Sequence, residues 1–141
     1  MRTARNHVLE VLAEHSVDDI AEDVQLIVSE LVTNAMRAAQ RFAVNRGVGW
    51  AWYERPVALR VIYRPAWVHL IVVDPDPVVP DPAPADLLEE NGRGLSIVDS
   101  VAALHWWMPG DHGKACHVVV TREQTPLKPE EADMLRRRVI L

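Results

Sequence analysis

A run of apolar residues at helical spacing constrains the fold of this chain more than any other sequence feature. The run consists of Ile20, Val24, Ile27, Val28, Leu31, Ala35 and Ala38. Residues with this spacing lie on one face of an amphipathic helix, and that face must be buried against another layer. The sequence therefore predicts a long helix, ending near residues 41–45, that packs on a second structural layer.

Glu30 and Asn34 lie one helical turn apart at the border of this apolar face. Polar side chains in such a place need partners, because an unsatisfied buried amide or carboxylate costs about 1–3 kcal/mol. A ligand or a metal ion would supply them, and so would a neighbouring side chain or water at the edge of the core. The two residues alone favour the second explanation.

The length and composition are those of one globular domain. Of the 141 residues, 49% are hydrophobic and 25% are charged, and the formal net charge is -5. This charge argues against electrostatic binding to nucleic acid or to an anionic membrane. The chain has one cysteine, Cys116, no apolar run near the ~20 residues that span a bilayer, and no signal-peptide core. We therefore expect a cytoplasmic protein without an intramolecular disulfide.

Two strands are predicted over residues 57–63 and 67–73, because both segments are rich in β-branched and aromatic residues. The three residues between them, Arg64-Pro65-Ala66, favour a hairpin. Asp74 comes directly after the second strand and opens a proline-rich segment. Prolines at that density exclude both a helix interior and a central strand.

The remaining elements complete an α+β pattern. A first helix is predicted over residues 3–15, a helix from Leu95 to Ala102, and a last strand over residues 115–121. Asp18 and Asp19 suit the N-terminus of the long helix, where a side-chain oxygen caps free amides. This order predicts a two-layer sandwich with helices on one face of a mixed, mainly antiparallel sheet.

The end of the chain has the charge pattern of a short helix. Pro129, Glu130 and Glu131 suit its first turn, and the arginines at 136–138 suit its last turn. We therefore divide the chain into a domain over residues 1–125 and a tail over residues 126–141. The arginines are interpreted as a solvated helix end in preference to a nucleic-acid contact.

Three glycine or histidine clusters are weak signals by themselves. Gly92-Arg93-Gly94 opens a helix, where free amides favour anions, but a Gly-x-Gly alone indicates a plain turn. It is neither a P-loop nor a full dinucleotide fingerprint. Gly113-Lys114 has the pattern of a hairpin corner. His112, Cys116 and His117 lack the spacing of a zinc site.

Three segments in this order resemble the motifs of one known family. Residues 30–35, Glu-Leu-Val-Thr-Asn-Ala, resemble an N-box, Asp74 resembles an adenine-binding aspartate, and residues 90–99 resemble a second glycine box. These motifs belong to the GHKL (Bergerat-fold) ATP-binding superfamily. Within it, the sequence is similar to the single-domain anti-sigma-factor serine/threonine kinases and related actinomycete regulators. The resemblance covers about residues 2–122.

The resemblance implies ATP and Mg²⁺ as cofactors and assigns a role to each matching residue. Asn34 would coordinate Mg²⁺, Glu30 would be the catalytic residue that orients or deprotonates the nucleophile, and Asp74 would accept from the adenine amino group. The cofactor-binding residues of the second glycine box would be Gly92, Arg93, Gly94 and Leu95. One protein oxygen suffices for Mg²⁺, since this ion keeps several waters and phosphate oxygens.

The resemblance also implies a partner protein and leaves three functions open. The first is a kinase that phosphorylates an anti-sigma-factor antagonist and binds a sigma factor. The second is a nucleotide-binding regulator without phosphate transfer. The third, outside the family, is an interaction module that uses four of the five tryptophans: Trp50, Trp52, Trp106 and Trp107. None of the three requires direct contact with nucleic acid or a membrane.

Two departures from the family pattern affect these expectations. Asp74-Pro75-Asp76-Pro77 stands where the family has its first glycine box, so the wall of the adenine pocket must be built differently. The chain also begins almost at its first helix, so we expect it to lack the N-terminal strand of the subgroup. We then expect an exposed sheet edge, which a homodimer or a different start of the chain would cover.

Overall fold

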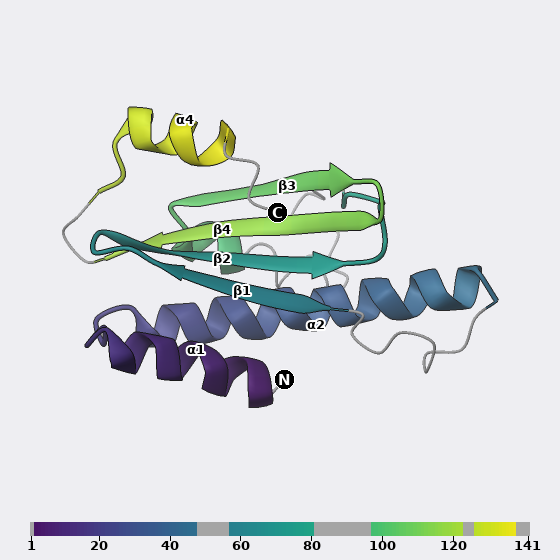
Figure 1. The fold of residues 1–141 in the computed structure, drawn as a ribbon, viewed down its shortest axis with the longest axis horizontal. Coiled ribbons are helices and arrows are strands. Elements are labelled where there is room, and N and C mark those ends of the chain that lie inside the picture. The colour runs from purple at the N-terminus through teal and green to yellow at the C-terminus, as the bar shows by residue number, and fades with distance from the viewer. Residues whose placement is uncertain (1, 48–56, 81–96, 123–125, 138–141) are drawn as a thin grey trace.

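The computed structural model describes residues 2–47, 57–80, 97–122 and 126–137. Along the chain, helices alternate with pairs of strands, and the strands form one sheet (Figure 1). The elements are α1 (Arg2–Glu14), α2 (Ala21–Asn45), β1 (Ala58–Tyr63), β2 (Trp67–Asp74), β3 (Leu104–Gly110), β4 (Gly113–Thr121) and α4 (Pro129–Arg137). Residues 97–101 are also helical.

The described strands form one sheet in the order β1-β2-β4-β3, and each of its pairings is antiparallel. The predicted hairpin between the first two strands is confirmed. Pro65 occupies the first central position of the turn, and Arg64 and Trp67 exchange backbone hydrogen bonds of 2.9 and 3.3 Å. The last strand, β4, lies in the middle of the sheet, so it is buried along most of its length.

Helices α1 and α2 cover one face of the sheet, as the sequence predicts (Figure 1). The apolar stripe of α2 is buried against alternate residues of the two central strands, since alternate side chains of a strand share a face. On the sheet side these residues are Val68, Leu70, Val72, Cys116, Val118 and Val120. The resulting α+β sandwich confirms the predicted fold class.

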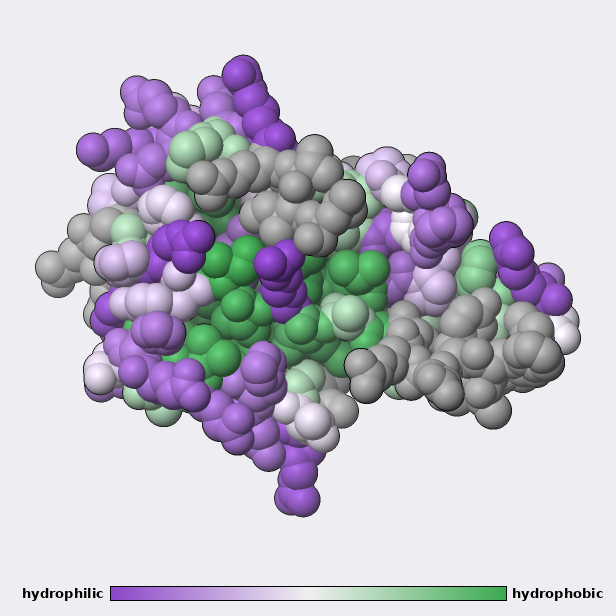
Figure 2. Space-filling model, viewed as in Figure 1, coloured by the Kyte–Doolittle hydropathy of each residue, from purple (hydrophilic) through white to green (hydrophobic). Residues whose placement is uncertain are grey.

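The tail helix α4 packs on the opposite face of the sheet, which we call the outer face. Leu135 is buried against Leu104 of β3 and Val119 of β4, and Val119 points away from the neighbouring Val118 and Val120. The predicted tail helix is therefore confirmed, and the structure adds that it covers part of the second face. Figure 2 shows apolar residues gathered over β1 and β2 at the centre of the molecule in the same view.

The outer face also contains a buried pair of histidines. Nε2 of His69 lies 3.0 Å from Nδ1 of His117, and each residue is 1% exposed. The ring of Trp106 stacks on His117 with centroids 4.8 Å apart. Burial lowers the pKa of His117 to about 4; burial, with the charges of His117 and Arg60, lowers the pKa of His69 to about 4. Both imidazoles are therefore neutral at pH 7.

The expected helix cap and the expected start of the last strand need correction, and one strand was not expected. Asp18 and Asp19 do not cap α2: its N-cap residue is Ile20, whose side chain has no oxygen, and Asp19 pairs instead with Arg122 at 3.0 Å. The sequence also gives no expectation of β3, which the structure adds as an edge strand beside β4. The last strand begins at Gly113, two residues before the predicted start.

Candidate functional site

Asn34 lies on the side of α2 that faces a cavity next to the sheet. It is half-buried, and the described residues give its side chain no hydrogen-bond partner. Leu31, three residues before Asn34, lines the same cavity, because residues three apart are neighbours on a helix surface. Ala35 lines it as well. Glu30 is half-buried one turn before Asn34 but does not line the cavity.

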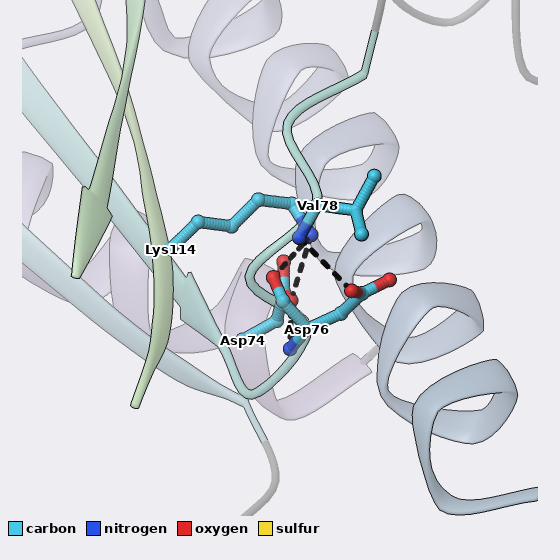
Figure 3. Close-up of polar contacts among 4 residues, drawn as sticks. All are labelled: Asp74, Asp76, Val78 and Lys114. Atoms are coloured by element: carbon cyan, nitrogen blue, oxygen red, sulfur yellow. Dashed lines mark hydrogen bonds and ion pairs between the residues drawn. The ribbon is translucent and has the colours of Figure 1, made fainter. Parts of the chain in front are cut away.

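Asp74 lies at the end of β2 and is 3% exposed. Its Oδ1 accepts hydrogen bonds from Nζ of Lys114 and from the backbone N–H of Asp76, both at 2.9 Å. Nζ of Lys114 also donates to the backbone carbonyl of Asp76 at 2.8 Å. Figure 3 shows the lysine reaching from β4 to the turn after β2, which it holds against the sheet. A second turn contact runs from the N–H of Val78 to Asp76 Oδ1 at 3.0 Å.

The strand register explains why these two charges meet. Asp74 and Lys114 are directly opposite in the β2–β4 pair, so their side chains share one face of the sheet. The preceding residue, Gly113, has φ +138°, and a Cβ at this position would lie 2.0 Å from the carbonyl oxygen of Asp74. Only glycine lets the two strand ends approach this closely.

The buried environment of Asp74 perturbs its carboxyl group. Burial raises the pKa of Asp74, whereas the hydrogen bond and charge of Lys114 oppose this rise. Taking both charges out of water is costly, and a buried ion pair is therefore weak evidence for stability. Perturbed carboxyl groups in a cleft are candidates for functional sites.

The cavity has a volume of about 500 Å³, within the range of roughly 300–1,000 Å³ of small-molecule sites. Helix α2 forms one wall, the turn after β2 forms another, and the sheet forms the floor. The described lining consists of Leu31, Asn34, Ala35, Ala38, Arg41, Phe42, Asn45, Val72, Asp74, Asp76, Pro77, Val78, Pro80, Trp107, Lys114 and Cys116. Asn34 and Asp74, two of the predicted site residues, thus line one cavity.

Other candidates are not placed in this cavity. Gly92, Arg93, Gly94 and Leu95 lie outside the described residues, as do Trp50 and Trp52. Trp107 lines the cavity, whereas Trp106 points to the outer face. The two described tryptophans of the candidate interaction surface therefore lie on opposite sides of the sheet.

Two features of the site are not apparent from the sequence: the pairing of Lys114 with Asp74 and the contacts of Cys116. The thiol of Cys116 lies 3.2 Å from Nε2 of His105, and Nδ1 of His105 lies 2.7 Å from Oδ1 of Asp99. The sequence does contain a hint of the Lys114 pairing. Lys114 directly precedes the predicted last strand, and an antiparallel partner of β2 that begins there would bring it next to the end of β2. No local pattern joins Asp99, His105 and Cys116, which come from three different segments.

The described residues contain no group of three or more His, Cys, Asp or Glu side chains that could hold a metal ion. His112 lies in the turn between β3 and β4, and Cys116 and His117 point to opposite faces of the sheet. None of the described helices is both long and apolar enough to cross a membrane.

Comparison with known proteins gives a family and no individual relative. Searches among curated proteins and among solved structures each find no match. The family of histidine kinase-like ATPase domains matches residues 1–120, a span that includes the long helix, the described sheet up to residue 120 and the whole described cavity lining. The family agrees with the resemblance to GHKL ATP-binding domains and with the antiparallel sheet under α1 and α2. The chain therefore belongs to the histidine kinase-like ATPase domain family.

Proposed function

We propose that this protein is a regulator that binds ATP with Mg²⁺ in the cavity beside α2 and acts on a partner protein, which it phosphorylates. The observation that carries the proposal is that Asn34 and Asp74, from separate motifs, line the same cavity. The lining also has the chemistry of a nucleotide site. It offers apolar and aromatic surface for a base, with a few polar groups that fix orientation.

The residues present fit both cofactors. The side-chain oxygen of Asn34 is the kind of ligand that Mg²⁺ prefers, and no described residue occupies it. Each described hydrogen bond to the Asp74 carboxylate reaches Oδ1, so Oδ2 remains to accept from the amino group of a base. Trp107 and Phe42 supply aromatic surface nearby.

The proposed roles combine this arrangement with the resemblance to the GHKL motifs, which alone supports the role of Glu30. Asn34 holds the metal, and Asp74 orients the base at the other side of the cavity. Glu30, one helical turn before Asn34, accepts the proton of the attacking hydroxyl group. Mg²⁺, when bound, neutralises the charge of the phosphates, so positioning and charge neutralisation supply most of the catalysis.

The proposed partner is a sigma factor, an anti-sigma-factor antagonist, or both. The resemblance to the anti-sigma-factor kinases supports this choice, and the net charge of -5 suits a basic protein surface. Affinity purification from a native extract should recover such a protein. Recovery of nucleic acid alone, stable to moderate salt, would contradict the proposal.

A homodimer that covers the edge strand β1 is a further part of the proposal, and sedimentation velocity measures it.

Calorimetry with ATP, with and without Mg²⁺, tests the two helix residues separately. Asn34→Ala should weaken Mg²⁺-dependent binding, whereas Glu30→Gln should bind normally and transfer phosphate about 10²–10⁴-fold more slowly, the usual contribution of a general base. Gln40→Ala, which changes an exposed amide on the same helix, is the matched control. If Asn34→Ala loses binding but wild-type protein transfers no phosphate to any partner, the protein is a nucleotide-binding regulator without kinase activity.

The recognition of the base needs a different design, because Asp74 is also half of an ion pair. A single change at Asp74 leaves Lys114 buried without its partner, so it tests folding as well as recognition. The double variant Asp74→Leu/Lys114→Met removes both charges together. If Asp74 reads the adenine amino group, wild-type protein prefers ATP to GTP and the double variant loses this preference. Equal affinity of the wild type for both nucleotides would exclude Asp74 as the base reader.

A further inference from the structure

Asp99, His105 and Cys116 form a chain of three side chains that the proposed function does not use. The imidazole of His105 contacts the carboxylate of Asp99 through Nδ1 at 2.7 Å and the thiol of Cys116 through Nε2 at 3.2 Å. The carboxylate accepts only, so Nδ1 carries the proton and Nε2 is left with a lone pair toward the thiol. This is the arrangement of a nucleophile, its base and the group that orients the base.

Cys116 is the member of this group that borders the cavity. Cys116 lines the cavity, whereas His105 does not, and the side chain of His105 is 10% exposed. Asp99 is 66% exposed on the helical segment 97–101. A small molecule in the cavity is therefore adjacent to Cys116 and not to the imidazole.

We propose that Cys116 is a covalent site for small α,β-unsaturated carbonyl compounds that enter the cavity, with His105 as its base and Asp99 as the residue that positions His105. The sulfur forms a bond to the β-carbon, and the π electrons of the double bond move to the carbonyl group as an enolate. The thiol proton passes to Nε2 of His105 and is then returned to the α-carbon. The product is a thioether that contains every atom of both reactants.

Both the reaction and the cavity favour this class of electrophile. Addition to a double bond needs neither an oxidant nor a leaving group, and the base regains its starting state within one reaction. Lys114 lines the same cavity, and an ammonium group stabilises the negative charge that develops on the enolate oxygen. The adduct would occupy part of the cavity.

The thiol depends on His105 because it is not ionised at rest. Burial, followed by the charges of Asp74 and Asp99, raises the pKa of the Cys116 thiol, and Lys114 only partly opposes this rise. A thiol of this kind reacts when the base removes its proton as the new bond forms. Reaction in the folded protein should therefore require His105, whereas reaction of the unfolded chain should not.

The test uses the whole protein and N-ethylmaleimide, followed by intact mass at neutral pH. Cys116 is the only cysteine of the sequence, so a single adduct identifies the site. We expect one adduct on the folded wild type and a rate at least about 100-fold lower in His105→Gln, the lower limit for a lost general base. His112→Gln, a change of an exposed histidine in the β3–β4 turn, should leave the rate unchanged.

Asp99→Asn separates positioning from simple support of the fold. Asp99→Ala removes the oxygen that accepts from Nδ1 of His105 and should slow labelling, whereas Asp99→Asn keeps an acceptor oxygen at that place and should restore most of the rate. Circular dichroism shows whether each variant is folded, and labelling in guanidinium chloride gives the rate of the unfolded chain. Folded His105→Gln protein that reacts as fast as the wild type would overturn the proposal. So would a wild type that reacts only after unfolding.

Protection by ATP tests access through the cavity, and this arm alone rests on the proposed function. Bound nucleotide should slow labelling of the wild type. Calorimetric binding of ATP with no effect on labelling would show that the thiol is reached from elsewhere and would overturn the covalent site. If ATP does not bind at all, the proposed function fails, whereas the dependence on His105 still decides the covalent site.

Discussion

At the scale of single residues, the buried pair formed by Asp74 and Lys114 should be sensitive to the loss of either partner. Both side chains are almost fully buried, with exposures of 3% and 2%, and their charged atoms are 2.9 Å apart. Removing one partner of such a pair leaves an uncompensated buried charge, which typically costs about 3–5 kcal/mol. Lys114→Met should lower the free energy of unfolding in urea by this amount.

Two further variants distinguish the lost pair from a general effect of losing a lysine. Lys128→Met removes an exposed lysine and should change stability by less than about 0.5 kcal/mol. Asp74→Leu/Lys114→Met should recover much of the stability that Lys114→Met loses, because no buried charge is left unpaired. A double variant as unstable as the single one would show that packing, and not charge, sets the cost.

The sequence predicted only part of this residue-level arrangement. Asn34 and Asp74 could be singled out because each belongs to a local motif, and the structure places both on one cavity. Their roles toward a nucleotide stay predictions. Lys114 and Cys116 could not be interpreted in the same way, since their partners depend on strand register and on contacts between distant segments.

At the scale of elements, the β3–β4 hairpin depends on one glycine and not on the other. A Cβ at Gly113 would meet the carbonyl oxygen of Asp74 at 2.0 Å, and φ is +138° there. At Gly110 the nearest atom to a Cβ is the carbonyl oxygen of Gly113 at 3.7 Å, an ordinary contact. Gly113→Ala should cost at least about 1–3 kcal/mol of backbone strain.

Gly110→Ala is the matched control, in the same hairpin and with the same change. Thermal unfolding should show a clear loss of stability for Gly113→Ala and little change for Gly110→Ala. Equal melting temperatures of the two variants would mean that the strand ends separate at no cost. Ligand binding should follow the same order, because displacement at Gly113 moves the backbone of Asp74.

The tail helix contributes to stability through one buried side chain. Leu135 is 3% exposed between α4 and the outer face, whereas the adjacent Met134 is 44% exposed. Leu135→Ala should destabilise the protein by about 2–5 kcal/mol, the usual cost of such a truncation in a core. Met134→Ala should have little effect. A Leu135→Ala protein with wild-type stability in urea would show that α4 is not docked in solution.

Elements with a regular apolar or charge pattern could be predicted from the sequence, whereas β3 could not. The long helix, the first hairpin and the tail helix each have a regular apolar or charge pattern, and the structure confirms them. The β3 sequence, Leu-His-Trp-Trp-Met-Pro-Gly, lacks alternation and contains a proline. Proline is tolerated on an edge strand because its missing N–H is not needed for the ladder, and β3 is an edge strand. The strand forms because β4 lies inside the sheet and pairs with β3 along its second edge, which the β3 sequence alone does not indicate.

At the scale of the whole molecule, the buried histidine pair links stability to pH. His69 and His117 have pKa values of about 4, below the ordinary value of 6.5. Their contribution to stability is therefore complete above pH 6.5 and is lost as the pH falls toward 4. One pKa unit corresponds to about 1.36 kcal/mol, so protonation of one histidine costs on the order of 3 kcal/mol. Urea unfolding between pH 7.5 and pH 5 measures this loss before most carboxyl groups titrate.

Replacement of the pair should flatten this part of the stability curve. His69→Phe/His117→Phe removes both groups that resist protonation, while His112→Gln changes only an exposed histidine. The slope between pH 6.5 and pH 5 should nearly disappear in the first variant and persist in the second. An unchanged slope in the phenylalanine variant would assign the acid sensitivity to other groups.

Strand β3 carries two adjacent tryptophans that point to opposite sides of the sheet. Trp107 lines the cavity, and Trp106 packs on the outer face next to the cluster of Leu135. Each indole is a fluorophore whose emission follows the polarity around it, so neighbouring residues report on different parts of the molecule. In single-tryptophan versions, Trp107 should respond to a molecule that enters the cavity and Trp106 to the release of α4. One edge strand thus gives two independent optical signals, one for occupancy and one for the docking of the tail.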